Sequence, residues 1–441
     1  MIRTLDLRGR GLSAAELARE IPRPETDVSH ATIAAGDLID DVRSRGTAAL
    51  LEHAERFDGV RPPSLRVAEH ELPAALARLD PSVRSALERA ISRVRSVSRA
   101  QVPQPTRTVL SDGAVVEQRW QAIRRVGLYV PGGKAVYPSS VVMNVVPAQE
   151  AGVESIVVAS PAQREFDGAV HPTVLGAAAL LGVTEVYAIG GASAIGALAF
   201  GVDDLGLDPV DLITGPGNVF VAAAKRLVRG VVGIDSEAGP TEILVIADAD
   251  ADPVLVAADL VSQAEHDELA ASVLVTDSAE LAEGVRRELE RLVDATKHGD
   301  RVRTALGGAQ SAIVLVDDEV AAARFSDAYA PEHLELQTAD PTRTLGLIHN
   351  AGAIFVGAHS PVSLGDYLAG SNHVLPTGGQ ARFSSGLGVH TFVRPQQVIR
   401  YDAEALAGVE RDIRALATAE DLPAHADAVT ARLPRSPGAS G

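Results

Sequence analysis

The chain contains no cysteine among its 441 residues. This absence excludes disulfide bonds, zinc sites built from thiolates and a cysteine nucleophile. Oxidation of an aldehyde through a thiohemiacetal is excluded for the same reason, so any such step must use activated water. A bound metal would need nitrogen and oxygen ligands, which suits zinc or a similar divalent ion.

Positive charge is scarce, and lysine is the scarcest source of it. The chain has 40 Lys and Arg against 58 Asp and Glu, for a formal net charge of −18. This balance argues against nucleic acid as the main partner. The only lysines are Lys134, Lys225 and Lys297, two of them beside glycine-rich turns. Either selection over arginine for the shape of the side chain or chance can explain why these two lysines occur at these positions.

No apolar run is long enough to span a bilayer, so we expect no membrane segment. The first ten residues are charged and lack the apolar core of a signal peptide, which predicts a cytoplasmic protein. Hydrophobic residues make up 46% of the chain, enough for substantial cores. Its length exceeds one compact core and predicts two or more domains.

The order of predicted elements indicates an α/β protein with two Rossmann-like, doubly wound parallel-sheet domains. Helical periodicity over about 26–99 ends at Pro103 and Pro105 and predicts a helical N-terminal region at 1–105. The first domain is expected at 106–240, with strands at 126–130, 155–159, 186–189 and 212–214 and helices at 172–181 and 219–228. The second is expected at 241–375, with strands at 243–246, 272–275, 312–316, 333–337 and 353–356. A tail at 376–441 is predicted to be helical and polar after Arg394 and disordered from Pro434 to Gly441.

Glycine-rich turns follow three strands of the first domain. They lie at 131–133, 190–191 and 215–217, where the carboxyl ends of parallel strands form the usual ligand-binding edge. Glycine allows close approach of a ligand, and a following helix N-terminus favours a phosphate group. None of them matches the G-x-G-x-x-G fingerprint. Each alone is more typical of a tight turn than of a ligand site, but three at one edge favour a ligand site.

Gln263 and His266 are candidate metal ligands near the end of a predicted helix. Asp252 can cap this helix and Pro253 suits its first turn. The i, i+3 spacing places Gln263 and His266 on one face, and the partial negative charge of a helix C-terminus favours a cation. The alternative is an ordinary pair of surface or cap residues.

Glu332 and His333 are candidate catalytic residues just before a predicted strand. Oxidation of an alcohol releases a hydroxyl proton, and histidine, with an ordinary pKa of about 6.5, suits the base. A later aldehyde-to-acid step needs a deprotonated water, which a carboxylate can provide. The alternative is a solvated acid beside a strand-edge histidine. Taken alone, Asp366, in a predicted glycine-rich loop, is more typical of a turn residue. His425, in the tail, is likewise more typical of a surface histidine.

Five ordered segments together resemble the histidinol dehydrogenase family, zinc enzymes that complete histidine biosynthesis, and the resemblance covers nearly the whole chain. The segments are 262–266, 330–334, 365–367, 371–376 and His425. The resemblance implies an NAD- and zinc-dependent four-electron oxidation of L-histidinol to L-histidine through bound L-histidinal. It further implies that His333 is the acid/base for the alcohol and that Glu332 activates water.

The resemblance also implies the binding residues. One zinc per subunit would be held by Gln263, His266, Asp366 and His425. The substrate contacts would be Thr241, Gln263, His266, His333, Asp366, Glu420 and His425, with His373 lining the pocket. NAD would contact Tyr129, Ser193 and Asn218, and the family pattern has glutamine at the position of Ser193.

A homodimer is implied, in which the tail of one subunit brings His425 to the site of the other. Three other functions stay open at this point. A paralogue could oxidise another polar alcohol, a zinc hydrolase could use Glu332 without redox chemistry, and a binding protein would need neither Glu332 nor His333.

Overall fold

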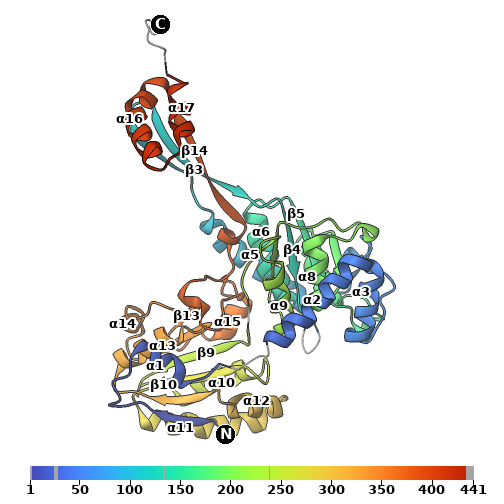
Figure 1. Cartoon of the computed structure of the whole chain (residues 1–441). Coiled ribbons are helices and arrows are strands. Elements are labelled where there is room, and N and C mark those ends of the chain that lie inside the picture. The colour runs from blue at the N-terminus through green and yellow to red at the C-terminus, as the bar shows by residue number, and fades with distance from the viewer. Residues whose placement is uncertain (1, 24–27, 133–135, 238, 434–441) are drawn as a thin grey trace, which may run out of the picture. The chain divides into compact units, whose positions relative to one another are not determined.

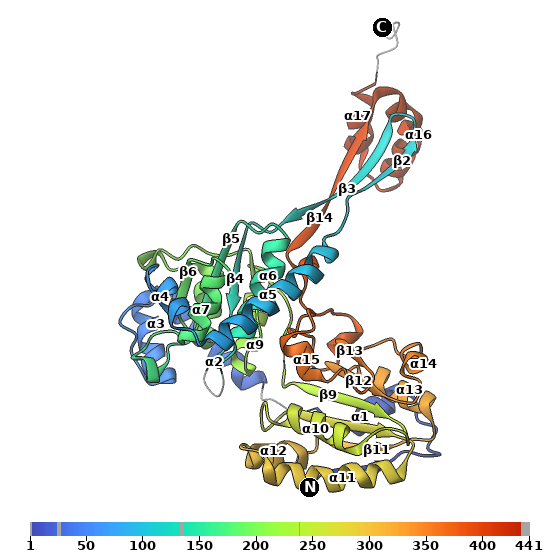
Figure 2. The ribbon, with the colours of Figure 1, turned by 180° about the vertical axis from the view of Figure 1, so that it is seen from behind.

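The computed structural model describes residues 2–23, 28–132, 136–237 and 239–433. Residues 434–441, for which disorder was predicted, lie outside the described residues. So does Gly133 of the first glycine-rich turn. The chain forms two units, unit 1 with residues 1–101 and 123–392 and unit 2 with residues 102–122 and 393–441. Figures 1 and 2 show the ribbon from opposite sides. None of the described helices is long and apolar enough to span a bilayer.

The first sheet of unit 1 has five parallel strands. Their order across the sheet is β6 (Glu185–Ala188), β5 (Ser155–Ser160), β4 (Arg125–Tyr129), β7 (Leu212–Thr214) and β8 (Gly233–Ile234). Every residue of the central strand β4 is buried. This burial on both faces is what a parallel sheet covered by helices requires, and it explains why the strand lacks polar alternation.

Two helical layers cover the first sheet. One hydrophobic core joins the sheet to α4 (Glu71–Arg78), α5 (Pro81–Gln101), α6 (Pro138–Glu150) and α7 (Pro172–Leu180). A second core joins its other face to α2 (Val28–Arg45), α3 (Thr47–His53), α8 (Gly191–Phe200) and α9 (Val219–Val228). A π-helix, η1 (Ala54–Asp58), continues α3. The helical N-terminal residues therefore complete the layers of this sheet.

The second sheet of unit 1 has six parallel strands. Their order is β1 (Arg3–Asp6), β11 (Ala312–Leu315), β10 (Ala271–Thr276), β9 (Glu242–Ala247), β12 (His333–Gln337) and β13 (Ala353–Val356). One face packs on α10 (Pro253–Ala264), α11 (Ala279–Ala295) and α12 (Gly299–Gly307), and the other on α1 (Ala14–Glu20) and α13 (Glu319–Tyr329) (Figure 2). The remaining short helices of unit 1, which lie between or after the strands of the two sheets, are α14 (Pro341–Leu345), α15 (Val362–Tyr367), η2 (Arg164–Phe166), η3 (Asp203–Leu205), η4 (Gln380–Arg382) and η5 (Val389–Thr391). Strand β1 was not predicted, because its short polar sequence carries little strand signal without its partner β11.

Unit 2 contains an antiparallel sheet and two helices. The strand order is β14 (Val393–Tyr401), β3 (Ala114–Ala122) and β2 (Thr106–Ser111), followed in sequence by α16 (Ala403–Ala419) and α17 (Pro423–Thr430). The prediction of helix directly after Arg394 is wrong, since β14 occupies that position. This polar strand pairs with β3 from Val393 to Tyr401, and the backbone ladder stabilises it without an apolar run.

The predicted α/β class with parallel sheets is confirmed. All nine predicted strands of the two parallel sheets are present, and their observed ends lie within one residue of the predicted ones. The predicted helices at 172–181 and 219–228 correspond to α7 and α9. The antiparallel strands β2 and β3 were not predicted, because the exposed residues of β2 lack a buried face.

A buried ion pair fixes the end of the first sheet. Lys225 of α9 is 1% exposed, forms an ion pair with Asp235, and donates a hydrogen bond of 3.0 Å to the carbonyl of Gly215. Asp235 also accepts a hydrogen bond of 2.8 Å from the Gly215 amide. The lysine therefore connects α9 to the turn after β7.

We predict that Lys225→Met lowers the free energy of unfolding by about 3 kcal/mol, because Asp235 would remain buried without its cation. Arg226→Met is the matched control, since the neighbouring Arg226 is half exposed and its pair with Glu237 should contribute less than about 1 kcal/mol. Urea unfolding of both variants measures the difference. Equal losses for the two variants would contradict the structural role of Lys225.

Candidate functional site

The candidate catalytic residues gather where two strands of the second sheet begin. Strands β9 and β12 are parallel neighbours, with His333 opposite Ile243. Thr241 and Glu242 therefore lie beside Glu332 and His333 at the amino edge of this sheet. This is the edge opposite to the usual ligand-binding edge of a doubly wound fold.

A strained turn positions Glu332 before β12. Ala330 ends α13 with a φ of +50°, an uncommon conformation for a residue with a side chain. The backbone then pairs with the start of β13, as the amides of Gly352 and Ala353 each donate a 2.9 Å hydrogen bond to the carbonyls of Pro331 and Glu332, respectively. A Cβ atom on Gly352 would lie 2.6 Å from the Glu332 carbonyl oxygen, so only glycine permits this approach.

Glu332 is 6% exposed, and its carboxyl group is held through one oxygen. Its Oε2 accepts hydrogen bonds from the Thr241 hydroxyl at 2.6 Å and from the Glu242 amide at 3.0 Å. Burial raises the pKa of Glu332 to about 8, although both hydrogen bonds favour the carboxylate. A carboxyl group with this pKa can exchange a proton near neutral pH.

His333 is oriented by the backbone of the neighbouring strand. Its Nδ1 lies 3.0 Å from the carbonyl oxygen of Glu242. Because a carbonyl oxygen only accepts, Nδ1 carries the proton, and Nε2 of the neutral ring is left as a base. Burial lowers the pKa of His333, while the negative charge of Asp366 opposes that effect. His333 can therefore take up a proton on Nε2.

Gln263 is the buried polar residue of α10. The Asp252 side chain caps this helix by accepting a 2.8 Å hydrogen bond from the Val254 amide, as predicted. Gln263 is 2% exposed, and its Nε2 donates a 2.6 Å hydrogen bond to the Thr241 hydroxyl. Among the described residues, nothing hydrogen-bonds to its Oε1, which is buried. A buried amide oxygen without a partner is costly and is available to a cation.

His266 lies just beyond this helix. The prediction that it shares a helical face with Gln263 is wrong, because α10 ends at Ala264. Its Nδ1 lies 3.1 Å from the Ser262 carbonyl oxygen and 3.3 Å from that of Gln263. These carbonyl groups require the proton on Nδ1 and leave the Nε2 lone pair for a ligand. The ring is exposed.

Asp366 lies in the short helix α15, so the prediction of a loop at this position is wrong. Asp366 is partly buried, and its charge acts on His333 and on His373. His373 does lie in a loop, where its Nδ1 is 3.0 Å from the Asp366 carbonyl oxygen and its Nε2 is 3.1 Å from the Ser140 hydroxyl. The effect of the Asp366 charge on His333 places this segment near the candidate catalytic pair.

Two residues of unit 1 offer donor atoms of the kinds that a metal site uses. Gln263 Oε1 and His266 Nε2 are the nitrogen and oxygen donors that zinc accepts, and Asp366 supplies a charge nearby. Within the described ranges, no group of three or more His, Asp or Glu side chains is arranged to hold a metal. The predicted set has only His266 and Asp366 of these types in unit 1, since its fourth member is His425.

Glu420 and His425 lie on one exposed turn of unit 2. Glu420 ends α16, and His425 lies in the first turn of α17. Asp421 has a φ of +55° between them, and the Leu422 amide donates a 2.8 Å hydrogen bond to the Ala417 carbonyl. Both side chains are exposed. The turn therefore presents a carboxylate and an imidazole together to solvent.

The predicted NAD contacts lie at the carboxyl edge of the first sheet. The Tyr129 hydroxyl, at the end of β4, accepts a 3.1 Å hydrogen bond from the Gly191 amide, and burial raises the pKa of Tyr129 to about 12. The Ser193 hydroxyl lies 2.8 Å from His53 Nδ1. The Asn218 side chain caps α9 through its Oδ1. The N-termini of α8 and α9 thus share this edge, an arrangement suited to a phosphate group.

Ser193 is engaged with a buried histidine. His53 Nε2 lies 3.0 Å from Asp41 Oδ2. Since the carboxylate accepts the Nε2 proton, Nδ1 of the neutral ring accepts from the Ser193 hydroxyl. The hydrogen bond from Arg45 lowers the pKa of Asp41 to about 2, so this carboxylate stays charged. The serine hydroxyl is therefore directed toward α3.

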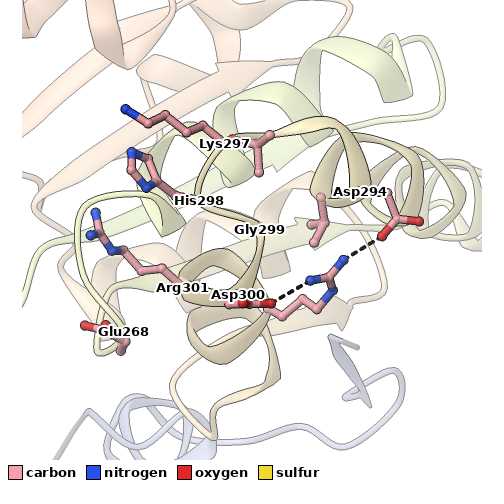
Figure 3. A pocket seen from close by; sticks show the side chains of 10 residues that line it. Glu268, Asp294, Lys297, His298, Gly299, Asp300 and Arg301 are labelled. Atoms are coloured by element: carbon pink, nitrogen blue, oxygen red, sulfur yellow. Dashed lines mark hydrogen bonds and ion pairs between the residues drawn. The ribbon is translucent and has the colours of Figure 1, made fainter.

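A separate polar cavity of about 460 Å³ is lined by Glu268 and by residues between Val293 and Arg303 (Figure 3). Arg301, which lines it, donates a 3.0 Å hydrogen bond to the Glu265 carbonyl. Arg303 is paired there with Asp294 at 2.7 Å and Asp300 at 3.0 Å. None of the predicted site residues lines this cavity, so it is distinct from the candidate site.

The sequence analysis missed Glu242, which positions His333. Its carbonyl binds His333, and its buried side chain is paired with Arg23 at 3.0 Å and bound by the Tyr329 hydroxyl at 3.1 Å. The signal was available, because Glu242 is a charged residue in an otherwise apolar strand. Such a residue is rarely buried without a role or a partner.

Comparison with known proteins identifies the relatives of this chain. A family model described as histidinol dehydrogenase matches residues 21–433. The chain is 66% identical to a histidinol dehydrogenase of Leifsonia xyli subsp. xyli over 98% of this chain and 99% of the relative. It is 58% identical to that of Thermobifida fusca over 99% and 98%. A crystal structure of histidinol dehydrogenase from Elizabethkingia anophelis is similar with a TM-score of 0.90 and 31% identity, covering 98% of each chain.

We predict that Thr241→Val destabilises the protein more at pH 9 than at pH 6. The folded-state pKa of Glu332, about 8, lies above its ordinary value of 4.5, so this group's contribution to stability falls as the pH rises through that window. Loss of the Thr241 hydrogen bond raises the pKa further and adds a penalty of about 1.4 kcal/mol per pKa unit at pH 9.

The measurement is urea unfolding at both pH values, with a chelator present so that metal does not contribute. Thr241→Ser retains the hydroxyl and is the matched control. A loss in Thr241→Val that is independent of pH would contradict the assigned hydrogen bond to the Glu332 carboxylate.

Proposed function

The chain belongs to the histidinol dehydrogenase family and is an oxidoreductase of histidine biosynthesis, and we propose that it oxidises L-histidinol to L-histidine in two steps with NAD and zinc. The observation that carries the proposal is the hydrogen-bonded series Gln263–Thr241–Glu332. It joins a free amide oxygen suited to a metal to a carboxyl group suited to proton transfer.

His333 acts as the base in the first step. Its Nε2 accepts the hydroxyl proton of the substrate as the carbon–hydrogen bond breaks, and the resulting aldehyde stays bound. The hydrogen bond from Nδ1 to the Glu242 carbonyl keeps the ring in the required tautomer. When bound, NAD supplies the hydride acceptor for this step and for the next.

Glu332 acts in the second step. Its carboxylate accepts a proton from the water that attacks the aldehyde carbon, so that the hydrated aldehyde can be oxidised to the acid. The raised pKa of Glu332, about 8, supports this role, because a stronger base removes a proton from water more readily. The absence of cysteine supports the same route, since no thiol can carry the acyl group.

We propose Gln263, His266, Asp366 and His425 as the ligands of one zinc ion per subunit. The free Oε1 of Gln263 and the tautomer of His266 support two of these assignments. A bound zinc would hold the imidazole and amine of the substrate and leave electron transfer to the dinucleotide. Thr241, His333 and Glu420 complete the proposed substrate contacts.

We assign dinucleotide binding to the first Rossmann-like domain, 106–240, and the metal and catalytic residues to the second, 241–375. Tyr129, Ser193 and Asn218 are the proposed NAD contacts. Within the helical region 1–105, the helices α2 to α5 support the first domain, and we propose that the tail, 376–441, serves a homodimer. The protein is proposed to work in the cytoplasm without nucleic-acid or membrane partners.

The stoichiometry of the reaction tests this proposal. With histidinol limiting and NAD in excess, the purified protein with zinc should form two NADH for each histidine produced, because both steps occur on one bound substrate. Absorbance of NADH and chromatography of histidine measure the ratio. One NADH with accumulation of free aldehyde would refute the four-electron reaction, and histidinol turnover without any NADH would refute NAD as the acceptor.

A second experiment tests the proposed sharing of sites between subunits. His333→Ala and His425→Ala should each be nearly inactive alone. If the tail completes the partner's site, a mixed dimer has one doubly defective site and one intact site. Random mixing gives about half mixed dimers, so activity should recover to roughly a quarter of wild type.

The two variants would be unfolded and refolded together and assayed for NADH formation. Differently tagged chains would establish that mixed dimers form. Activity no greater than the sum of the separately refolded variants, in the presence of mixed dimers, would place His425 in the site of its own chain.

A further inference from the structure

Asp58 lies at the carboxyl edge of the first sheet, although it belongs to the N-terminal helical region. It is the last residue of the π-helix η1, an element that often occurs at functional positions. A Cβ atom built on Gly190 would lie 3.4 Å from Asp58 Oδ2 and 2.7 Å from the side chain of Pro161. The charge of Asp58 also acts on Tyr129. Asp58 therefore faces the turns that follow β5 and β6.

The carboxylate of Asp58 has no hydrogen bond or ion pair with any described residue. Burial alone raises the pKa of Asp58 to about 6, and no neighbouring charge offsets this effect. Two nearby cations are engaged elsewhere, since Arg56 stacks on Phe57 at 4.9 Å and Arg61 is paired with Glu55 at 3.4 Å. A partly buried carboxylate without a partner is unfavourable for folding and is more typical of a ligand site.

The position matches a known requirement of dinucleotide folds. In the common arrangement, an acidic residue about 20 residues beyond the glycine-rich turn, in the same βαβ unit, binds the ribose hydroxyls. Here β5 is that strand, and Ser160, Pro161 and Ala162 occupy its end. No acidic residue is present there in the sequence, and Asp58 approaches the same place from another segment of the chain.

We propose that Asp58 accepts hydrogen bonds from the vicinal hydroxyls of the adenosine ribose and so selects NAD over NADP. This inference rests on the proposed use of NAD. Two carboxylate oxygens can accept from two adjacent hydroxyls, and such hydrogen bonds are stronger than neutral ones. A 2′-phosphate would remove one donor and bring a second anion against the carboxylate.

Equilibrium binding tests the assignment without relying on turnover. NAD and NADP would be titrated by calorimetry into the wild type and into Asp58→Asn, which keeps the shape and removes the charge. The wild type should prefer NAD, and Asp58→Asn should change the ratio of the two affinities by at least about tenfold toward NADP. Asp58→Ser, which leaves room for a phosphate, should change it in the same direction and serves if Asp58→Asn does not fold.

Glu55→Gln is the matched control, because it removes an exposed carboxylate from the same π-helix and should leave the ratio unchanged. An unchanged ratio in both Asp58 variants, with NAD still bound, would overturn this inference alone. Equal affinity of the wild type for NAD and NADP would overturn it as well. A wild type that binds neither dinucleotide would overturn the proposed use of NAD together with the inference.

Discussion

The candidate site depends on the two hydrogen bonds of the Thr241 hydroxyl group. This hydroxyl donates to Glu332 Oε2 and accepts from Gln263 Nε2, both at 2.6 Å. Because one amide hydrogen of Gln263 is used in this way, its amide orientation is fixed and Oε1 is left without a partner. The same hydroxyl also favours the charged form of a buried carboxyl group. One small side chain thus couples the proposed metal ligand to the proposed water activator, and a change at either end affects the other.

The proposed binding residues lie at the carboxyl edge of the first parallel sheet but at the amino edge of the second. In the first sheet, the predicted NAD contacts Tyr129 and Asn218 follow the carboxyl ends of strands, where the helix N-termini favour anions. In the second sheet, Glu332 and Thr241 precede the strands, and Gln263 lies in the last turn of α10. The C-terminus of a helix carries partial negative charge, which favours a cation. Backbone electrostatics therefore supports an anionic dinucleotide on one sheet and a metal ion on the other.

The sequence was sufficient for the parts of the fold that rest on continuous burial. Strands β4 and β9, for example, are buried along their whole length and consist almost entirely of apolar residues. The boundaries of such strands follow from the ends of the apolar run. It was insufficient where stability comes from partners distant in sequence, as for β1 with β11 and β14 with β3. The same limit applied to the site: the motif residues could be named, but the hydrogen bond from His333 to Glu242 required the register of β12 on β9. His266 was misplaced because helix ends depend on the local backbone rather than on spacing.

The central claim is that the chain holds a metal ion through the free oxygen of Gln263. The most direct test is a crystal structure of the zinc-loaded protein with anomalous diffraction at the zinc absorption edge. The account predicts one strong anomalous peak per subunit, about 2.0–2.2 Å from Gln263 Oε1 and His266 Nε2, with the Thr241 hydrogen bonds retained. A zinc ion bound elsewhere, with Gln263 Oε1 still lacking a ligand at full zinc occupancy, would contradict it.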